Sequence, residues 1–297
     1  MNESLNRPSK FRSWILASRP KTLLAAVVPV LIGTSVAVKN DSHNFAAATI
    51  ALLCSILIQI GTNFVNDLYD FLSGKDTEER KGPTRALAAG WISKKEMKLG
   101  IYLTFGIAFL AGLYLVYIGG SFILIIGIVS ILTGISYTAG PFPLAYNGLG
   151  DIFVFIFFGL VATCGTYYVQ TLEINSIILL ASIPAGLLIT NILVINNFRD
   201  IDEDKLNNKN TLAVKFGRTF TKAQYISSII LSYIAVISIY YFSQSIYILL
   251  PLVSIPLAIK QILQLNRLKG TDLNFLLEST AKFSALFGIL LSLGFLL

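Results

Sequence analysis

Long apolar stretches alternate with short polar segments along almost the whole chain. Nine of these stretches approach the length of about 20 residues that an α-helix needs to cross the hydrocarbon core of a bilayer. They are Thr22–Val38, Phe45–Val65, Met97–Ile118, Ser121–Thr138, Leu149–Val169, Ser176–Asn197, Ala223–Phe242, Ile246–Leu265 and Ala281–Leu297. The third and fourth are separated only by the short turn Gly119-Gly120. The pattern predicts an all-α integral membrane protein: one domain over residues 1–297, built as a bundle of nine transmembrane helices, with residues 1–13 as a polar cytoplasmic tail.

Composition supports a membrane location. The chain is 55% hydrophobic and 13% charged, and the charged fraction is about half of the roughly 25% found in soluble domains. The first 21 residues are polar and basic without an apolar core, so we expect no cleavable signal peptide. Cys54 and Cys164 fall inside apolar stretches, where a disulfide is not expected. His43 is the only histidine, which argues against a catalytic histidine or a zinc site.

The distribution of positive charge predicts the orientation in the membrane. A net charge of +7 could suggest nucleic acid as a partner. With nine helices and the N-terminus inside, however, the inner segments hold 21 of the 23 Lys and Arg residues, Lys39 lies outside and Lys282 begins the last helix. This is the positive-inside bias. We therefore expect no nucleic-acid partner. We expect a multi-pass protein of a prokaryotic inner or plasma membrane, or of a derived organelle membrane, with the N-terminus and active site cytoplasmic and the C-terminus outside.

Two polar clusters of matching spacing lie at the cytoplasmic ends of the second and sixth stretches. In each cluster an asparagine is followed by aspartates at helical spacing, so the side chains share one face. Stacked carboxylates repel each other unless positive charge lies between them. Oxygen ligands of this kind suit Mg²⁺, which completes its shell with water and phosphate oxygens. The pattern predicts a metal-bridged diphosphate site with four catalytic aspartates. The candidate metal ligands are Asn63, Asp67, Asp70, Asn196, Asp200 and Asp204.

Basic residues follow both clusters closely. A diphosphate leaves readily only if its growing negative charge is neutralised, and cations beside metal-binding acids suit this chemistry. Lys75, Lys94, Lys95 and Lys98 are interpreted instead as topology signals that contact lipid headgroups. The candidate diphosphate-binding residues are Lys21, Arg80, Lys81, Arg85, Arg199 and Lys209.

The inner loop between the fourth and fifth stretches differs from the other two because it has no Lys or Arg. Pro141 and Pro143 stiffen it, and Tyr137 and Tyr146 make it aromatic. Such a loop could wall a pocket for a flat aromatic molecule, although these tyrosines could also belong to an interfacial aromatic belt. Asp151, just after this loop, is expected to cap the fifth helix.

At these residues the chain resembles the UbiA-type superfamily of membrane aromatic prenyltransferases. Asn63, Asp67 and Asp70 match its first Asp-rich motif, and Asp200 and Asp204 match the second. The usual first motif has a further acid where this chain has Gly74, with Asp76 two residues later. The segments 66–85, 137–151 and 196–214, with Arg19-Pro20-Lys21-Thr22, are most similar to the 1,4-dihydroxy-2-naphthoate polyprenyltransferases of menaquinone synthesis.

This resemblance implies a nine-helix fold, Mg²⁺ as cofactor and a polyprenyl diphosphate as donor. It also implies that dihydroxynaphthoate accepts the prenyl group with loss of CO₂ and diphosphate, giving demethylmenaquinone. Arg19, Tyr137 and Tyr146 are the candidate acceptor-binding residues. One alternative is a related transferase that uses homogentisate, 4-hydroxybenzoate, a porphyrin or a chlorophyllide. A cation-coupled transporter is the alternative of another class, but transporter carboxylates usually lie near the midplane at a repeat interface, whereas these acids gather at helix ends.

Overall fold

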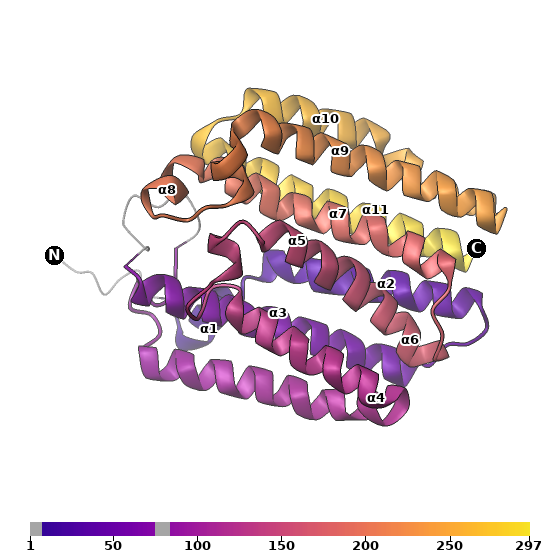
Figure 1. Ribbon diagram of the computed structural model, residues 1–297, viewed down its shortest axis with the longest axis horizontal. Helices are drawn as coiled ribbons and strands as arrows, with labels where there is room; N and C mark the ends of the chain where they lie inside the picture. The colour runs from indigo at the N-terminus through magenta and orange to yellow at the C-terminus, as the bar shows by residue number, and fades with distance from the viewer. Residues whose placement is uncertain (1–7, 75–83) are drawn as a thin grey trace.

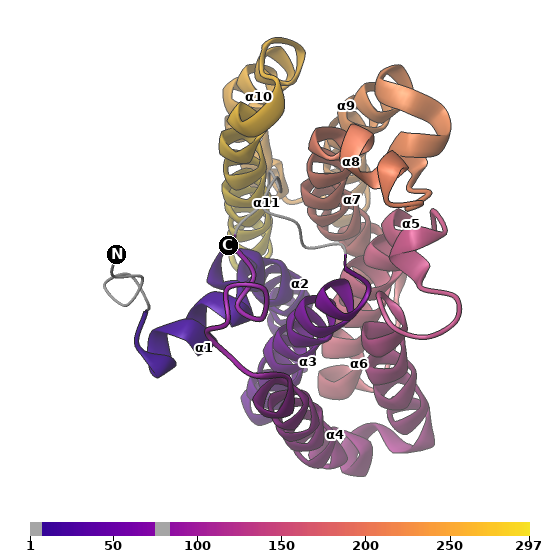
Figure 2. The ribbon, with the colours of Figure 1, turned by 90° about the vertical axis from the view of Figure 1, so that its left-hand side faces the viewer.

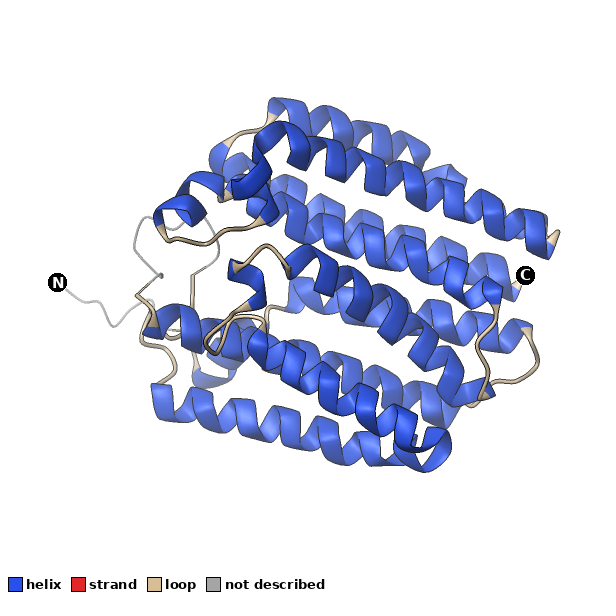
Figure 3. Cartoon of the chain, in the orientation of Figure 1, coloured by secondary structure: helices blue, strands red, loops and turns tan. Residues whose placement is uncertain are grey.

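The structure is a computed structural model that describes residues 8–74 and 84–297. Within these ranges the chain is helical and contains no strand (Figure 3). The principal α-helices are α1 Lys10–Ser18, α2 Pro20–Lys39, α3 Phe45–Leu72, α4 Lys94–Ser136, α5 Gly150–Val154, α6 Gly165–Thr171, α7 Ser176–Arg199, α8 Ile201–Leu206, α9 Leu212–Ser243, α10 Ile255–Arg267 and α11 Leu273–Leu296. A π-helical stretch, η3 Phe155–Cys164, joins α5 to α6, and short 3₁₀ segments occupy Leu144–Tyr146 (η2), Ile246–Ser254 (η4) and Gly270–Asp272 (η5).

The described residues contain eight helical segments long and apolar enough to cross a membrane. The third of these, α4, has 43 residues, and at 1.5 Å per residue it would extend to about 65 Å, far beyond a bilayer core of about 30 Å. It does not extend straight, because Gly120 has the non-helical angles φ 70° and ψ −162°. The ribbon doubles back there (Figure 1), and a Cβ placed on Gly134 would lie 3.7 Å from the Phe105 ring. The turn expected at Gly119-Gly120 is thus present, although the total of nine spans stays a prediction.

Several helices extend beyond their expected ends. Helix α3 continues to Leu72, so Asp67 and Asp70 lie on the helix, whereas the sequence placed a loop from residue 67. Helix α11 begins at Leu273 rather than Ala281, so Lys282 lies inside it and pairs with Glu278 at 2.9 Å. Residues 10–13, expected in a polar tail, form the first turn of α1, capped by Ser9. In each case the polar residues at the helix end have partners, so the length of the apolar stretch alone underestimates the length of the helix.

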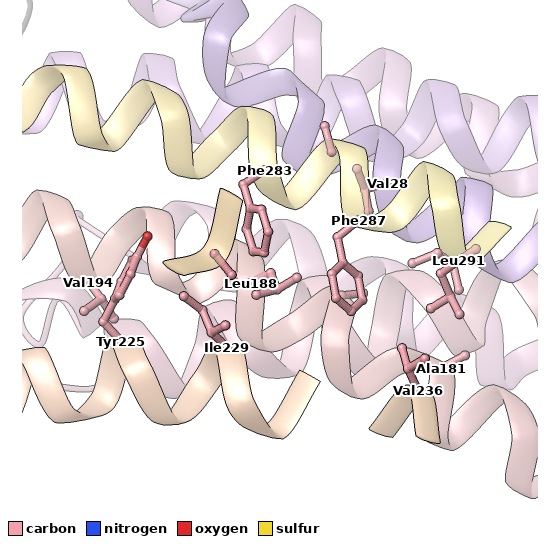
Figure 4. Packing of buried hydrophobic residues seen from close by; sticks show 14 of the residues in the cluster. Val28, Ala181, Leu188, Val194, Tyr225, Ile229, Val236, Phe283, Phe287 and Leu291 are labelled. Carbon is pink, nitrogen blue, oxygen red and sulfur yellow. The ribbon is translucent and has the colours of Figure 1, made fainter. Parts of the chain in front are cut away.

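Helix α7 lies at the centre of one half of the bundle. In its most apolar window 61% of the residues are buried, against 17% for α4, whose exposed apolar residues are positioned to face lipid. Figure 4 shows Phe283 and Phe287 of α11 pointing toward Leu188 of α7 and Ile229 of α9. Val28 of α2 joins the same cluster. This core fixes the four helices α2, α7, α9 and α11 relative to one another.

Glycines bring η3 against α7. A Cβ on Gly159 would lie 2.9 Å from Gly186 Cα, and one on Gly186 would lie 2.9 Å from the Phe155 carbonyl oxygen. Backbones this close leave no room for side chains. This close packing fixes η3, and with it the start of α5, against α7. π-Helical turns are often found near functional sites.

The connections that carry the predicted motifs gather at one end of the bundle. Figure 1 places α8 and α1 toward the left-hand end and the C-terminus at the other. Figure 2, which looks onto that left-hand end, shows α8, the loop before α5 and the end of α3 surrounding the middle of the molecule. The fold therefore brings together segments more than a hundred residues apart.

Candidate functional site

The first motif lies on the last turns of α3. Asp67 is 2% exposed, and its carboxylate accepts hydrogen bonds from the backbone N–H groups of Ala86 at 3.0 Å and Leu87 at 3.4 Å. The Asp67 carboxylate thus holds the segment at Ala86 and Leu87 against α3. A charge buried in this way is stabilised by donors that point at it.

Asp70 lies one turn further along and is held by two side chains. Tyr146 donates its hydroxyl to Asp70 Oδ1, and Arg85 donates to Oδ2. The Arg85–Asp70 ion pair is largely buried, with both side chains 15% exposed or less. Of the predicted diphosphate ligands, Arg85 is therefore in the first motif's immediate surroundings.

The motif asparagines make structural contacts. Asn63 is 3% exposed, and its Nδ2 donates to the Ser18 carbonyl at 2.9 Å and to Thr22 Oγ1 at 3.3 Å, which ties the α1–α2 corner to α3. Asn66 Oδ1 accepts from Thr138 Oγ1 at 2.6 Å. Sequence spacing identified Asn63 but gave no reason to name Thr138.

The second motif is placed where α7 ends and α8 begins. Arg199, 2% exposed, donates through Nε and Nη2 to the two oxygens of the neighbouring Asp200, each at 2.6 Å. The same guanidinium donates to Asn196 Oδ1 at 2.9 Å and to Asn274 Oδ1 at 2.5 Å. The fork of an arginine suits such planar two-point contacts. Arg199 therefore orders this motif as Arg85 orders the first.

Asp204 completes the second motif. Lys209 donates to Asp204 Oδ1 at 3.1 Å, while Oδ2 is buried without a hydrogen-bond partner among the described residues. Burial raises the pKa of the Asp204 carboxyl, and Lys209 opposes this by stabilising the charged form. A buried oxygen of this kind is suited to receive a cation or a donor from a ligand.

Tyr146 connects the two motifs. Its hydroxyl bonds to Asp70, its carbonyl oxygen accepts from Asn210 N–H at 2.9 Å, and Lys209 Nζ lies 5.9 Å from the centre of its ring. Because Lys209 also pairs with Asp204, one short chain of contacts joins the first motif to the second.

Tyr137 faces the same region. Withdrawal from water raises the pKa of its hydroxyl above the ordinary value, and the nearby charge of Asp151 adds to the effect while Arg19 opposes it. The carboxylates of Asp204 and Asp70 raise the pKa further. The Tyr137 hydroxyl therefore lies close enough to both motifs, and to Arg19, for their charges to act on it. Tyr146, which bonds to Asp70, belongs to the same region.

Two of the predicted residues, Lys21 and Asp151, are placed differently. Lys21 is 75% exposed and pairs with Glu278 of α11 at 2.5 Å, at the rim rather than among the aspartates. Arg80 and Lys81 lie outside the described residues. The expected cap function of Asp151 is wrong: Leu149 occupies the N-cap position of α5, and the Asp151 side chain points to Asn197 and Gln224. Sequence position alone does not distinguish an aspartate that caps a helix from one whose side chain is buried against neighbouring helices.

The donors present fit Mg²⁺ by their chemistry. The motifs offer carboxylate and amide oxygens, including the partnerless Oδ2 of Asp204, and Mg²⁺ prefers such ligands. Among the described residues no three His, Cys, Asp or Glu side chains lie close enough to hold one ion. The carboxylates instead are divided between two helix ends that face each other.

An apolar cavity of about 180 Å³ lies within the bundle. Its wall is formed by α3 from Ala51 to Gln59, by both arms of α4 and by η3 and α6. Gln59, at the end of this wall along α3, is one helical turn from Asn63, and Asp67 lies a further turn along the same helix. Its few polar groups include Ser55 and Thr166.

These features define a helical membrane protein with two opposed aspartate motifs beside an apolar cavity. The chain belongs to the UbiA prenyltransferase family, whose profile matches residues 26–286. It is 34% identical over 97% of its length to the 1,4-dihydroxy-2-naphthoate octaprenyltransferase of Escherichia coli, of which it covers 96%. It is 35% identical to the enzyme of that name from Bacillus subtilis, with 94% of this chain and 91% of the relative covered. The corresponding Haemophilus influenzae protein is 42% identical over 70% of each chain.

Solved structures have the same fold. A UbiA homologue from Archaeoglobus fulgidus bound to GPP and Mg²⁺ superimposes with a TM-score of 0.68 at 18% identity, covering 96% of this chain and 99% of the other. A homologue from Aeropyrum pernix without ligand gives a TM-score of 0.68 at 13% identity, over 91% and 96% of the two chains. The predicted all-α membrane fold of the UbiA type is thus confirmed.

Proposed function

We propose that this protein transfers a polyprenyl group from an allylic polyprenyl diphosphate to 1,4-dihydroxy-2-naphthoate, with loss of diphosphate and CO₂, to give the hydroquinone form of demethylmenaquinone. The observation that carries the proposal is the contact chain from Asp70 through Tyr146 to Lys209 and Asp204, which opposes two acidic motifs across one site. The likeness to three relatives named 1,4-dihydroxy-2-naphthoate octaprenyltransferase supports the choice of acceptor.

The donor diphosphate is held between the motifs. Asp67, Asp70, Asp200 and Asp204, with the amide oxygens of Asn63 and Asn196, are the residues that would bind Mg²⁺. When bound, the ion supplies positive charge that stabilises the departing diphosphate. Arg85, Arg199 and Lys209 already neutralise these carboxylates, and the same positive charges would stabilise the phosphate oxygens of a bound donor.

The acceptor ring lies between this site and the rigid loop before α5. Tyr137 and Tyr146 offer aromatic surfaces and hydroxyl groups there, and Arg19 adds a positive charge. The bond between the prenyl carbon and diphosphate oxygen breaks, the electron-rich ring attacks that carbon, and the ring carboxylate leaves as CO₂. The loop at 139–148 contains no Lys or Arg that would hold the carboxylate in place.

The prenyl chain occupies the apolar cavity. The cavity wall along α3 from Gln59 to Ala51 is about 12 Å long, which accommodates the first part of a polyprenyl tail. Each CH₂ group withdrawn from water contributes about 0.8 kcal/mol. The rest of a long chain would lie between the helices and the lipid.

The test offers several aromatic acceptors with one labelled polyprenyl diphosphate to the purified protein in lipid. We expect one product, with the mass of prenylated, decarboxylated dihydroxynaphthoate, and release of ¹⁴CO₂ from carboxyl-labelled substrate. If 4-hydroxybenzoate is prenylated efficiently with its carboxylate retained, and dihydroxynaphthoate is not, the proposed acceptor is wrong.

A further inference from the structure

A second polar cluster lies beside the acidic motifs and takes no part in binding the diphosphate. Asp151, at the start of α5, is 6% exposed. Its Oδ2 accepts from Gln224 Nε2 of α9 at 2.9 Å, and its Oδ1 accepts from Asn197 Nδ2 of α7 at 3.4 Å. Within the described ranges no Lys or Arg forms an ion pair with it. A carboxylate is thus buried between three helices with only neutral amide donors.

Asn197 brings an acceptor without a partner to the same place. Its side chain is 4% exposed and its Oδ1 atom is buried without a hydrogen-bond partner in the described structure. The Nδ2 atom of the same amide group bonds to Asp151, so the Oδ1 atom of Asn197 also lies close to the carboxylate. Leaving such an atom unpaired costs stability, so native proteins usually supply a donor.

The cluster borders the acceptor side of the site. A Cβ placed on Gly150, the residue before Asp151, would lie 3.2 Å from the Tyr137 hydroxyl oxygen and 3.4 Å from Leu193 of α7. Asp151 is also the carboxylate that acts most strongly on the Tyr137 hydroxyl. The Tyr137 hydroxyl therefore lies against the turn that carries Asp151.

We propose that Asp151 and Asn197 bind a ring hydroxyl of the aromatic acceptor, with Gln224 positioning the Asp151 carboxylate. The Oδ1 atom of Asn197, which has no partner among the described residues, can only accept a hydrogen bond, so its partner must be a donor. A phenolic O–H meets that requirement, and a site built to bond a hydroxyl discriminates strongly against analogues that lack it. This rests on the proposed function, and it adds the group by which the acceptor is recognised.

The test compares competitive inhibition of the prenyl transfer by 1-hydroxy-2-naphthoate and by 2-naphthoate, which differ in one hydroxyl. We expect the hydroxylated compound to bind wild type at least about tenfold more tightly, since bonds to charged groups are among the stronger ones. In Asp151→Asn and in Asn197→Leu this ratio should fall toward one. The KM for polyprenyl diphosphate should stay within about twofold, which a general loss of structure would not allow.

The matched control is Asp202→Asn, because Asp202 is 72% exposed at the same end of the bundle and pairs with Arg218. It should preserve the ratio. If one or both variants fail to fold, the ratio in wild type still decides: equal inhibition by the two naphthoates overturns the proposal. If dihydroxynaphthoate is not prenylated at all, the proposed function fails. If it is prenylated but the ratio persists in both variants, only the hydroxyl site is wrong.

Discussion

At the scale of single residues, three of the motif acids are each held by a basic partner. Asp70 is paired with Arg85, Asp200 with Arg199 and Asp204 with Lys209. Removing one member of a buried pair leaves an uncompensated charge, which costs about 3–5 kcal/mol. These cations therefore stabilise the unliganded site as well as serving the substrate, and mutations have to separate the two effects.

Isosteric substitutions make that separation for the acids. We expect Asp67→Asn or Asp200→Asn to lower kcat by about 100-fold or more, because each removes a charge needed to bind metal and is worth several kcal/mol at the transition state. The measurement is product formation at saturating Mg²⁺, with folding checked by thermal unfolding in detergent. Asp202→Asn should be active. Near-normal rates in both motif variants would refute the metal-binding assignment.

Tyr146 allows a finer test of the contact between motifs. Tyr146→Phe removes only the hydroxyl that donates to Asp70, while the backbone bond from Asn210 N–H is kept. We expect the Mg²⁺ concentration for half-maximal rate to rise, because Asp70 loses a donor that orients it. The free energy of unfolding should fall by no more than about 1.5–3 kcal/mol, the contribution of a single hydrogen bond to a charged group. An unchanged Mg²⁺ dependence would show that the hydroxyl does not orient Asp70.

At the scale of elements, glycine contacts set how near η3 comes to α7. The two backbones approach at Gly159 and Gly186 with no space for a methyl group. The same support carries Asp151 at the start of α5 and Asn197 at the end of α7. Close packing here thus connects the membrane-embedded part of the bundle with the polar cluster above it.

This contact predicts unequal effects of two similar substitutions. Gly159→Ala should destabilise the protein by about 1–3 kcal/mol, the usual cost of overpacking. Gly165→Ala, one element further on where a Cβ meets nothing within 4 Å, should be neutral or slightly stabilising, since alanine is the better helix former. The comparison is made by thermal unfolding in detergent with and without lipid. Equal stability of the two variants would contradict the close approach.

At the scale of the whole molecule, the sequence was a good guide to spans and motifs and a poor one to their contacts. Apolar length and helical spacing identified the α3 and α7 helices and the shared face of Asn63, Asp67 and Asp70, because these depend on local periodicity. The role of Tyr146 as a bridge, and the burial of Asp151 beside Asn197, depend on side chains brought together by tertiary packing. No spacing rule contains that information.

Helix ends were misplaced for a related reason. Apolar length marks the part of a helix inside the hydrocarbon, but α3 continues to Leu72 and α9 begins at Leu212, outside the apolar stretches, with a kink at the non-helical Gly217. Thr211 caps α9 through a hydrogen bond to Val214 N–H, and Asp70 on α3 is paired with Arg85. Polar residues that find partners extend a helix beyond the membrane.

The orientation in the membrane is the remaining large-scale prediction. The structure places α8 at one end of the bundle and the α2–α3 connection with the C-terminus at the other (Figure 1), and the basic residues predict that the α8 end faces the cytoplasm. Cys54 and Cys164 are buried, so replacing both gives a background for single cysteines. In intact cells an impermeant thiol reagent should label Ser42→Cys at once. Asn208→Cys and Glu79→Cys should react only after permeabilisation, because the basic residues of the inner segments favour the cytoplasmic side for these loops. Labelling of Asn208→Cys from outside, with Ser42→Cys protected, would invert the topology and require the site to face away from the cytoplasm.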